Sequence, residues 1–193
     1  MSYSSAIALT DFHIHVDERT EIRPLHMRDV EELFHLVTKN RDHLYPWMAW
    51  IPEGPYTQEM TREYLELVEQ KAHEQSEFHA VLVRDGHLIG DAGFPMIDWR
   101  NRVAHIGYWL DKDHVGSGIM TSAVRALTGY AFDALELNRI EIRCSTQNIA
   151  SAAVAQRLGF VHEGILRQAF AVRDTYTDDN VFAMLREDWD PSP

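Results

Sequence analysis

The stretch Tyr108–Phe132, "YWLDKDHVGSGIMTSAVRALTGYAF", joins a strand-like run to a helical pattern through a charged turn and two glycines. From Gly118 onward, apolar residues recur about once per helical turn, which predicts a helix that packs one face on a sheet. The residues of that face are Ile119, Ala123, Leu127, Tyr130, Ala131 and Ala134. The stretch therefore predicts a strand, a glycine turn and a helix in succession.

The start of this predicted helix is suited to bind a phosphate group. The first N–H groups of a helix have no partner within it and carry the positive end of its dipole. Glycines let an anion come close to those groups. A plain tight turn without a ligand gives the same pattern. The chain has neither G-x-x-x-x-G-K-[ST] nor G-x-G-x-x-G after an opening strand, so the turn is neither a P-loop nor a dinucleotide-binding turn.

The remaining segments predict strands on both sides of this stretch. Strand-like runs cover 12–16, 20–25, 78–84, 88–98, 102–111 and 139–145, and a final hairpin covers 161–188. Helices are predicted after Asp29, after the capping residue Thr57 and after the capping residue Asn148, with Glu32 completing a capping box at the first. This order predicts an α/β fold in which helices flank a mixed sheet, and 1–193 is taken as a single domain.

Composition and charge limit the class of partner. The 193 residues carry a formal net charge of −12, which argues against direct nucleic-acid binding and suits cationic partners, or solubility alone. No stretch has the length and apolar character of a membrane span, and the first residues do not resemble a signal peptide. The single cysteine, Cys144, excludes an internal disulfide, so a cytoplasmic location is expected. His13 and His15 lack an evident third ligand, so no metal site is predicted.

Four motifs in order carry a resemblance to a known family. They are "IGYWL" at 106–110, "GSGIMT" at 116–121, N-x-x-S at 148–151 and "RLGFVHEG" at 157–164. Together they resemble the GNAT superfamily of N-acetyltransferases, in its RimJ/RimL branch that acetylates protein N-termini, over about residues 21–189. The resemblance implies the GNAT acyl-CoA N-acyltransferase fold, a central mixed twisted sheet flanked by helices. It also implies acetyl-CoA as co-substrate and an amine as acceptor, without a metal.

The resemblance also implies a set of cofactor-binding residues. These are Trp109, Leu110, Val115, Gly116, Ser117, Gly118, Ile119, Met120, Asn148 and Ser151. At the first position of the family's turn pattern, Val115 replaces a polar residue. Because main-chain N–H groups bind the pyrophosphate, and valine keeps its N–H, we expect acetyl-CoA binding to be preserved.

Two residues are candidates for proton transfer. Relatives carry a glutamate where this chain has Phe170, and many have a glutamate where this chain has His105. His105, with an ordinary pKa near 6.5, is a candidate base, or else a strand histidine with one structural hydrogen bond. Ser151 is the candidate proton donor to the leaving thiolate, or else an ordinary first-turn serine. The tyrosine acid of other GNAT enzymes would fall near Gln156, so that mechanism does not transfer.

The acceptor site is predicted from aromatic residues in loops. Trp47 and Trp50 flank a proline in the loop "LYPWMAW" and either wall an acceptor pocket or plug the core. Tyr176, between the last two strands, is a candidate for the opposite wall of the same pocket.

The leading acceptor is the N-terminal α-amine of a protein, of the ribosomal-protein type. An α-amine has a pKa near 7.7–8.0, so roughly a tenth or more is neutral at cytoplasmic pH and little basic help is needed. Two alternatives stay open: a small-molecule amine such as an antibiotic or polyamine, and a regulator that binds acyl-CoA without turnover. A homodimer is also open, as is a donor longer than acetyl.

Overall fold

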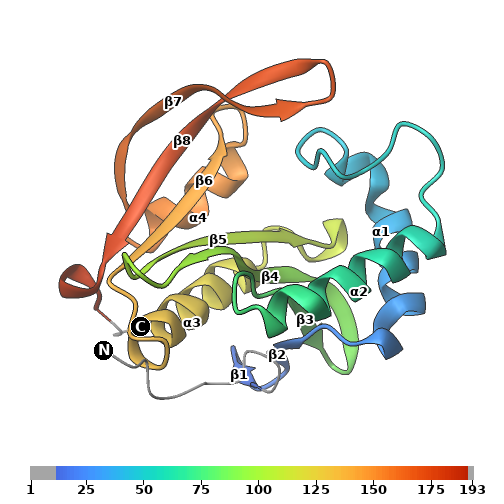
Figure 1. Cartoon of the computed structure of the whole chain (residues 1–193), viewed down its shortest axis with the longest axis horizontal. Helices are drawn as coiled ribbons and strands as arrows, with labels where there is room; N and C mark the ends of the chain where they lie inside the picture. The colour runs from blue at the N-terminus through green and yellow to red at the C-terminus, as the bar shows by residue number, and fades with distance from the viewer. Residues whose placement is uncertain (1–11, 191–193) are drawn as a thin grey trace.

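The computed structural model describes residues 12–190, which form one eight-stranded sheet with four α-helices (Figure 1). The strands are β1 (Ile14–His15), β2 (Thr20–Pro24), β3 (Ala80–Arg84), β4 (His87–Asp98), β5 (Val103–Leu110), β6 (Arg139–Ser145), β7 (Val161–Val172) and β8 (Thr175–Leu185). The helices are α1 (Val30–Leu44), α2 (Gln58–His73), α3 (Ile119–Asp133) and α4 (Ile149–Arg157). Single 3-10 turns cover Met27–Asp29, Lys112–His114 and Arg186–Asp188.

The sheet has the spatial order β1-β2-β3-β4-β5-β6-β8-β7, and every neighbouring pair except β5–β6 is antiparallel. The parallel pair is short, running from Val103 opposite Arg139 to His105 opposite Glu141. Beyond His105 the two strands diverge, as Figure 1 shows. The mixed sheet predicted from the sequence is confirmed, and its one parallel junction opens into a gap.

The two faces of the sheet bury separate apolar clusters. On one face α3 and α4 pack through fully buried residues such as Leu127 and Ala155. On the other face α1 and α2 pack through Leu33 and Leu65. Burying a side chain of leucine size contributes about 1.5–3 kcal/mol. The sheet is therefore held from both sides, and the β5–β6 gap lies between two fixed layers.

The predicted helix caps are partly confirmed. The Thr57 hydroxyl accepts the Met60 N–H at the start of α2, as expected. Asp29 precedes α1, but its carboxylate instead accepts two hydrogen bonds from Arg23 and one from the His26 N–H, so the predicted side-chain cap is wrong. Glu32 does not complete a capping box, because it accepts the Leu88 N–H of β4 at 2.9 Å. In both cases a tertiary partner displaces the local one.

The β3–β4 turn follows its sequence signal. Asp85 and Gly86 both have positive φ, +51° and +83°, the conformation that a two-residue hairpin turn requires. The register places Val81 opposite Asp91, and on the next strand Trp109 opposite Asp91. Residues at these positions share one face of the sheet, the face covered by α1 and α2.

Candidate active site

The β5–β6 gap leaves main-chain groups of β5 without a strand partner. The Asp111 N–H donates to the Ile89 carbonyl of β4 at 2.7 Å, and main-chain direction alternates along a strand. The N–H groups of Tyr108 and Leu110 therefore point away from β4, toward the edge that β6 has left. Such N–H groups can polarise a carbonyl oxygen placed in the gap.

The start of α3 has the geometry that binds anions. Gly116 and Gly118 have φ of +80° and +83°, values that L side chains rarely adopt. Gly118 is the N-cap and provides no side-chain hydrogen bond, and the first intrahelical bond runs from the Ser122 N–H to the Gly118 carbonyl. The N–H groups before Ser122 are thus available to a phosphate oxygen. Val115 is 51% exposed beside them.

Side chains of Ile119 and Met120 point the other way, into the core. They fix the first turn of α3 on the sheet while leaving its main chain to a ligand. The Ser117 hydroxyl donates to the His114 carbonyl, which closes the turn locally. The glycine turn is therefore rigid on its inner side and open on its outer side.

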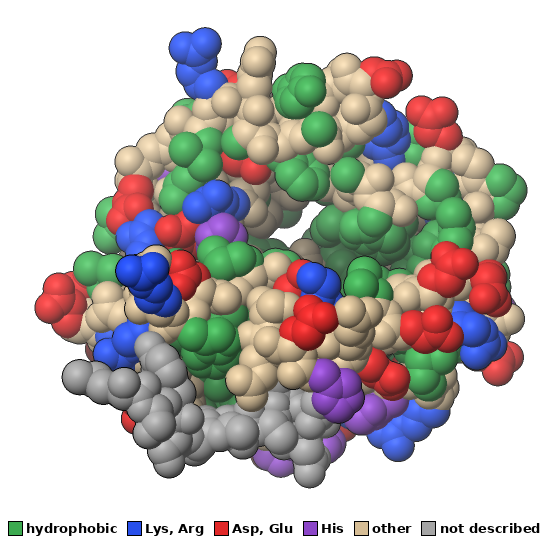
Figure 2. Space-filling view, in the orientation of Figure 1, with side chains coloured by type: hydrophobic (Ala, Val, Ile, Leu, Met, Phe, Trp, Pro, Cys, Tyr) green, Lys and Arg blue, Asp and Glu red, His purple; other side chains and the backbone are tan. Residues whose placement is uncertain are grey.

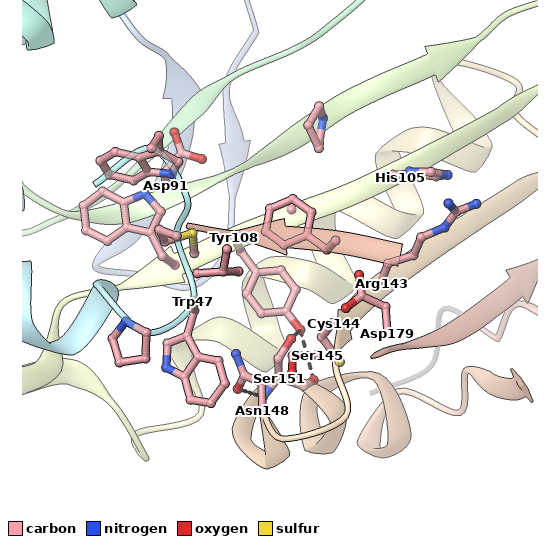
Figure 3. A pocket seen from close by; sticks show the side chains of 18 of the residues that line it. Trp47, Asp91, His105, Tyr108, Arg143, Cys144, Ser145, Asn148, Ser151 and Asp179 are labelled. Atoms are coloured by element: carbon pink, nitrogen blue, oxygen red, sulfur yellow. Dashed lines mark hydrogen bonds between the residues drawn. The ribbon is translucent and has the colours of Figure 1, made fainter. Parts of the chain in front are cut away.

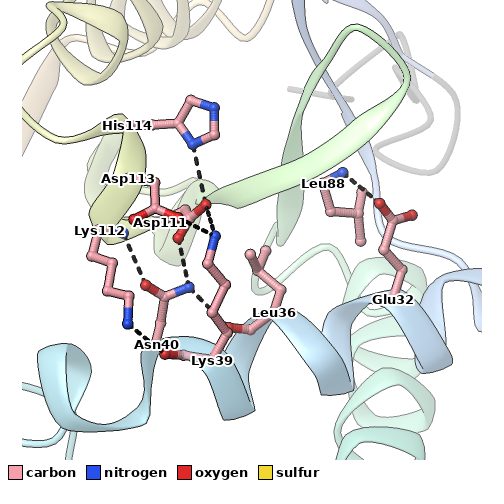
Figure 4. Close-up of polar contacts among 9 residues, drawn as sticks. All are labelled: Glu32, Leu36, Lys39, Asn40, Leu88, Asp111, Lys112, Asp113 and His114. Carbon is pink, nitrogen blue, oxygen red and sulfur yellow. Dashed lines mark hydrogen bonds and ion pairs between the residues drawn. The ribbon is translucent and has the colours of Figure 1, made fainter.

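A buried polar cluster ties the segment before this turn to α1 (Figure 4). The Asp111 carboxylate, 2% exposed, accepts hydrogen bonds from Lys39 at 2.7 Å and from Asn40 at 2.9 Å. Asn40 is fully buried, and its amide oxygen accepts the Lys112 N–H at 2.8 Å. Burial alone would raise the pKa of Asp111, but the hydrogen bonds from Lys39 and Asn40 outweigh it and hold the pKa below its usual value. Because every polar group in the cluster is paired, α1 anchors the entry to the turn.

A cavity of about 800 Å³ opens on the α1–α2 face beside the gap (Figures 2 and 3). Its walls come from α1, α2, the loop between them, β4, β5, β6, α4 and the β7–β8 hairpin. Most of the lining is apolar or aromatic, and the space-filling view shows the molecule hollowed at this point. A cavity of this size and character is typical of a small-molecule or peptide-end site.

The loop tryptophans lie where the sequence predicted them. Trp47 and Trp50 both line the cavity, and Phe170 lines it from β7. Tyr176 does not line it and is 68% exposed, so that prediction is wrong. Side chains alternate along a strand, and on β8 Thr177 rather than its neighbour faces the cavity.

Trp109 was predicted to contact the cofactor, and its side chain lies at the cavity. Its indole lines the cavity and is 9% exposed, and its main chain is directed to β4, opposite Asp91. The neighbouring Leu110 supplies a main-chain N–H to the gap instead. Neither Leu110 nor the turn 115–120 belongs to the cavity lining.

A phenol and a hydroxyl meet at the base of the gap. The Tyr108 hydroxyl lies 3.0 Å from the Ser151 hydroxyl and donates to the Ser151 carbonyl at 3.1 Å. Asn148 caps α4 as predicted, its amide oxygen accepting the Ser151 N–H at 3.1 Å. Burial raises the pKa of Tyr108 far above its usual value, so the phenol keeps its proton. The free thiol of Cys144 lines the same part of the cavity, and burial raises its pKa as well.

His105 lies at the other end of the cavity from Asp91, as Figure 3 shows. Its Nε2 is 3.1 Å from a carboxylate oxygen of Glu141, which also accepts hydrogen bonds from Arg139 and Arg143. Burial, and then the charge of Arg143, lower the pKa of His105 below its usual value. The imidazole is therefore neutral near pH 7 and able to accept a proton.

The arrangement defines a class of protein before any comparison is made. The start of α3 can bind a phosphate group, β5 has free N–H groups, and a cavity for an acceptor adjoins that strand. This combination is typical of a transferase that uses a phosphate-bearing donor. Among residues 12–190 no group of three or more His, Cys, Asp or Glu could hold a metal ion. Within the same range no helix is long and apolar enough to cross a membrane.

The comparisons name the family. Residues 19–161 match the model of the acetyltransferase (GNAT) domain, and the chain belongs to this family, in its RimJ/RimL branch. It is 34% identical over 182 residues to the putative ribosomal N-acetyltransferase YdaF of Bacillus subtilis, covering 93% of this chain and 98% of the relative. It is 33% identical over 175 residues to the ribosomal-protein-serine acetyltransferase of Escherichia coli, covering 89% and 96%.

A solved structure shares the fold. The RimL ribosomal L7/L12 α-N-protein acetyltransferase in complex with coenzyme A superposes with a TM-score of 0.85 at 30% identity, covering 90% of this chain and 98% of that one. The GNAT fold predicted from the sequence is confirmed, and the chain is an acetyl-CoA-dependent acetyltransferase.

Sequence reasoning missed three side chains of the site. Tyr108 lies inside the "IGYWL" motif at 106–110. Its position in that motif, on the strand β5 that separates from β6 beyond His105, was the signal that could have identified it. Glu141 and Asp91 carry no local signal, because strand register alone brings Glu141 to His105 and Asp91 to the cavity.

Proposed function

We propose that this protein acetylates the N-terminal α-amine of a protein, of the ribosomal-protein type, with acetyl-CoA as donor. The proposal rests on one observation: the cavity meets the β5–β6 gap at Tyr108 and Ser151. Two relatives are named as acetyltransferases of ribosomal proteins, one of them putatively, which supports the same acceptor. We further propose that 1–193 is one domain that works in the cytoplasm, where ribosomal proteins are found.

The donor fits the groups that the chain presents. Free N–H groups at the start of α3 would hold the pyrophosphate, and one free N–H group of β5, that of Tyr108 or that of Leu110, would hold the carbonyl oxygen of the acetyl group. When bound, acetyl-CoA supplies an activated acetyl thioester. The α3 contacts are made by the main chain, so Val115 in place of a polar residue is compatible with them.

The proton path uses two groups of the cavity lining, His105 of β5 and Ser151 of α4. Neutral His105, oriented by Glu141, accepts the proton that the attacking amine loses, directly or through water in the cavity. Ser151 Oγ, hydrogen-bonded to the Tyr108 phenol, gives a proton to the sulfur that leaves. The tyrosine acid of other GNAT enzymes would fall near Gln156, and in this chain Tyr108 provides a phenol from a different element, β5. Phe170 contributes only apolar surface to the wall.

The acceptor cavity favours an amine that is already partly neutral. An α-amine, with a pKa near 7.7–8.0, needs far less basic assistance than a lysine side chain with a pKa near 10.4. The walls provided by Trp47 and Trp50 would surround the first residue of a chain entering from solvent. Internal lysines are therefore expected to be poor acceptors.

A peptide panel tests the proposal. Each peptide with a free N-terminus, serine- or alanine-initiated, is paired with its N-terminally blocked version, and release of free coenzyme A is followed. We expect turnover of the free peptides alone, with the acetyl group on the α-amine by mass spectrometry. Equal turnover of blocked peptides would contradict the assignment. Activity confined to polyamines or aminoglycosides would establish the small-molecule alternative, and binding without turnover the regulatory one.

A further inference from the structure

Asp91 is a carboxylate in an apolar part of the cavity. It lies on β4 between Val81 of β3 and Trp109 of β5, both buried, and its side chain lines the cavity. Leu33 and Val37 of α1 line the same cavity from the opposite layer. Among the described residues 12–190, no hydrogen bond or ion pair reaches its carboxylate.

Among the described residues Asp91 has no ion-pair partner. The charge of His79 acts to lower the pKa of Asp91, but the two ring nitrogens of His79 are bonded to Tyr64 at 3.1 Å and to Glu77 at 3.1 Å. Arg143, which also lines the cavity, is hydrogen-bonded to Glu141 at the other end. An unpaired carboxylate in such a site is costly, and burial raises its pKa to about 6.

The walls near Asp91 suit a positively charged group. Tyr64 of α2, Trp109 of β5 and the loop residues Trp47, Trp50 and Tyr56 all line the cavity. Aromatic faces attract cations, most strongly where water is excluded. A carboxylate among aromatic side chains is the usual protein environment for an ammonium ion.

The position of Asp91 relative to the donor decides which cation it receives. Its register partner Trp109 stands between Tyr108 and Leu110, the two residues whose N–H groups face the β5–β6 gap. Asp91 is thus one strand spacing, about 5 Å, from the segment that would hold the acetyl group. Figure 3 shows Tyr108 between Asp91 and His105, so an ammonium group held by Asp91 lies beside the donor strand and moves toward His105 to lose its proton.

We propose that Asp91 binds the α-ammonium group of the acceptor as it enters the cavity, and so selects chains with a free N-terminus. The inference rests on the proposed function, because it takes a peptide N-terminus as the acceptor. An acetylated N-terminus has no charge for Asp91 to pair with, so the product leaves the site. Asp91 is here a specificity-determining residue that touches the substrate.

A thermodynamic cycle tests the contact. The probes are a serine-initiated hexapeptide amide and its des-amino analogue, which lacks only the α-amine. Each is titrated calorimetrically into the wild type and into Asp91→Asn, with saturating coenzyme A, which has no acetyl group to transfer. We expect the wild type to bind the free-amine peptide about tenfold or more tighter than the des-amino analogue. In Asp91→Asn the ratio of the two dissociation constants should be less than about threefold.

A matched control removes the same charge elsewhere. Asp133 ends α3 and is exposed on the opposite side of the sheet, so Asp133→Asn should keep the wild-type preference. If Asp91→Asn keeps the wild-type preference for the free-amine peptide, and the wild type acetylates that peptide, the inference about Asp91 is wrong and the proposed function stands. No binding and no acetylation of the peptide by the wild type would overturn the proposed function together with it. Circular dichroism confirms that both variants are folded.

Discussion

The two sides of β5 bind by different means. Toward the gap and α3, the available groups are main-chain N–H donors, and the residue types that matter are glycines that free them. Toward the α1–α2 face, the cavity is built from side chains contributed by eight different segments. A site made from main chain tolerates side-chain replacement, as Val115 illustrates, whereas a site made from side chains changes with each of them.

This contrast predicts opposite sensitivities for the two sides. Substitutions on the donor side should matter only when they add charge or strain at the glycine turn. Substitutions in the cavity wall away from Asn148 and Ser151 should change the acceptor that is used while leaving acetyl-CoA binding intact. Each experiment below compares one side with the other.

The largest effect is expected at Gly118. Gly118→Asp puts a carboxylate beside the phosphate-binding N–H groups and should weaken acetyl-CoA binding by about 2–4 kcal/mol. Gly118→Asn has the same shape without the charge, and asparagine tolerates positive φ better than most residues. Calorimetric titration of both variants should therefore show a much smaller loss for Gly118→Asn. Equal losses would mean that backbone strain, and not an anion site, accounts for the effect.

The next effect concerns the proton given to the leaving sulfur. Tyr108→Phe removes the phenol that bonds to Ser151, and Ser151→Ala removes the hydroxyl itself. Each should lower kcat by about 10–100-fold, and the double variant should lose little more than the worse single one, because the two act as a unit. Rapid-quench and steady-state rates measure this. If the losses in the free energy of activation add fully in the double variant, Tyr108 and Ser151 act independently.

His105 should govern the pH dependence of kcat. A base must be unprotonated, so kcat should be constant near neutrality and fall as the pH drops through the pKa of His105, which lies below its usual 6.5. The charged groups around it are Arg143, Glu141 and Arg139. His105→Gln should lower kcat about tenfold and remove this acidic limb. A limb that persists in the variant would assign it to another group.

Asp91→Asn should make the protein more stable. The pKa of the Asp91 carboxyl is about 6 in the fold against an ordinary value of 3.8, so its ionised form costs stability above pH 4 and most fully above pH 6. Two pKa units correspond to about 2.7 kcal/mol, and water at the cavity wall reduces the expected gain to about 1–2 kcal/mol. Thermal unfolding at pH 7.5 should show a higher Tm for Asp91→Asn, and at about pH 4 the difference should vanish. A lower Tm at pH 7.5 would show that Asp91 is stabilising.

The smallest effect is expected from the loop tryptophans. Trp47→Ala and Trp50→Ala each remove part of the acceptor wall, which should raise the KM for the peptide about three- to tenfold. The KM for acetyl-CoA should stay within about twofold, because the cavity that these tryptophans line includes no residue of α3 or of the turn 115–120. Steady-state kinetics with each substrate varied in turn make the comparison. A shift in both constants would link the loop to the donor side.

The contrast also explains what the sequence could and could not predict. The strands, the glycine turn and the caps Thr57 and Asn148 follow from local patterns, and they were predicted with the sheet they build. The wrong cap at Asp29 shows where a distant partner, Arg23, takes over a local role. Tyr176 was expected in a loop between the last two strands, but it lies in β8, where alternation turns Thr177 and not Tyr176 toward the cavity.

Asp91 illustrates the limit most clearly. Nothing in "LIGDAGF" marks this aspartate as different from one that faces solvent. Its role arises from the pairing of three strands and the placement of two helices above them. The strand, turn and helix of the donor side were predictable because they follow one another in one short segment, whereas the cavity is formed where eight segments meet.

The short parallel junction between β5 and β6 has a consequence for how the chain folds. On its C-terminal side the sheet is held by β6–β8 and β7–β8 pairs, and on its N-terminal side by successive antiparallel neighbours. Only three residue pairs, Val103 to His105 with Arg139 to Glu141, join the two parts within the sheet, and the crossover through α3 must close first. Contacts between distant segments form late, because loop closure precedes them. The catalytic groups should then come together in the last step of folding, when β5 pairs with β6. A ligand that contacts both parts of the sheet would stabilise this late pairing.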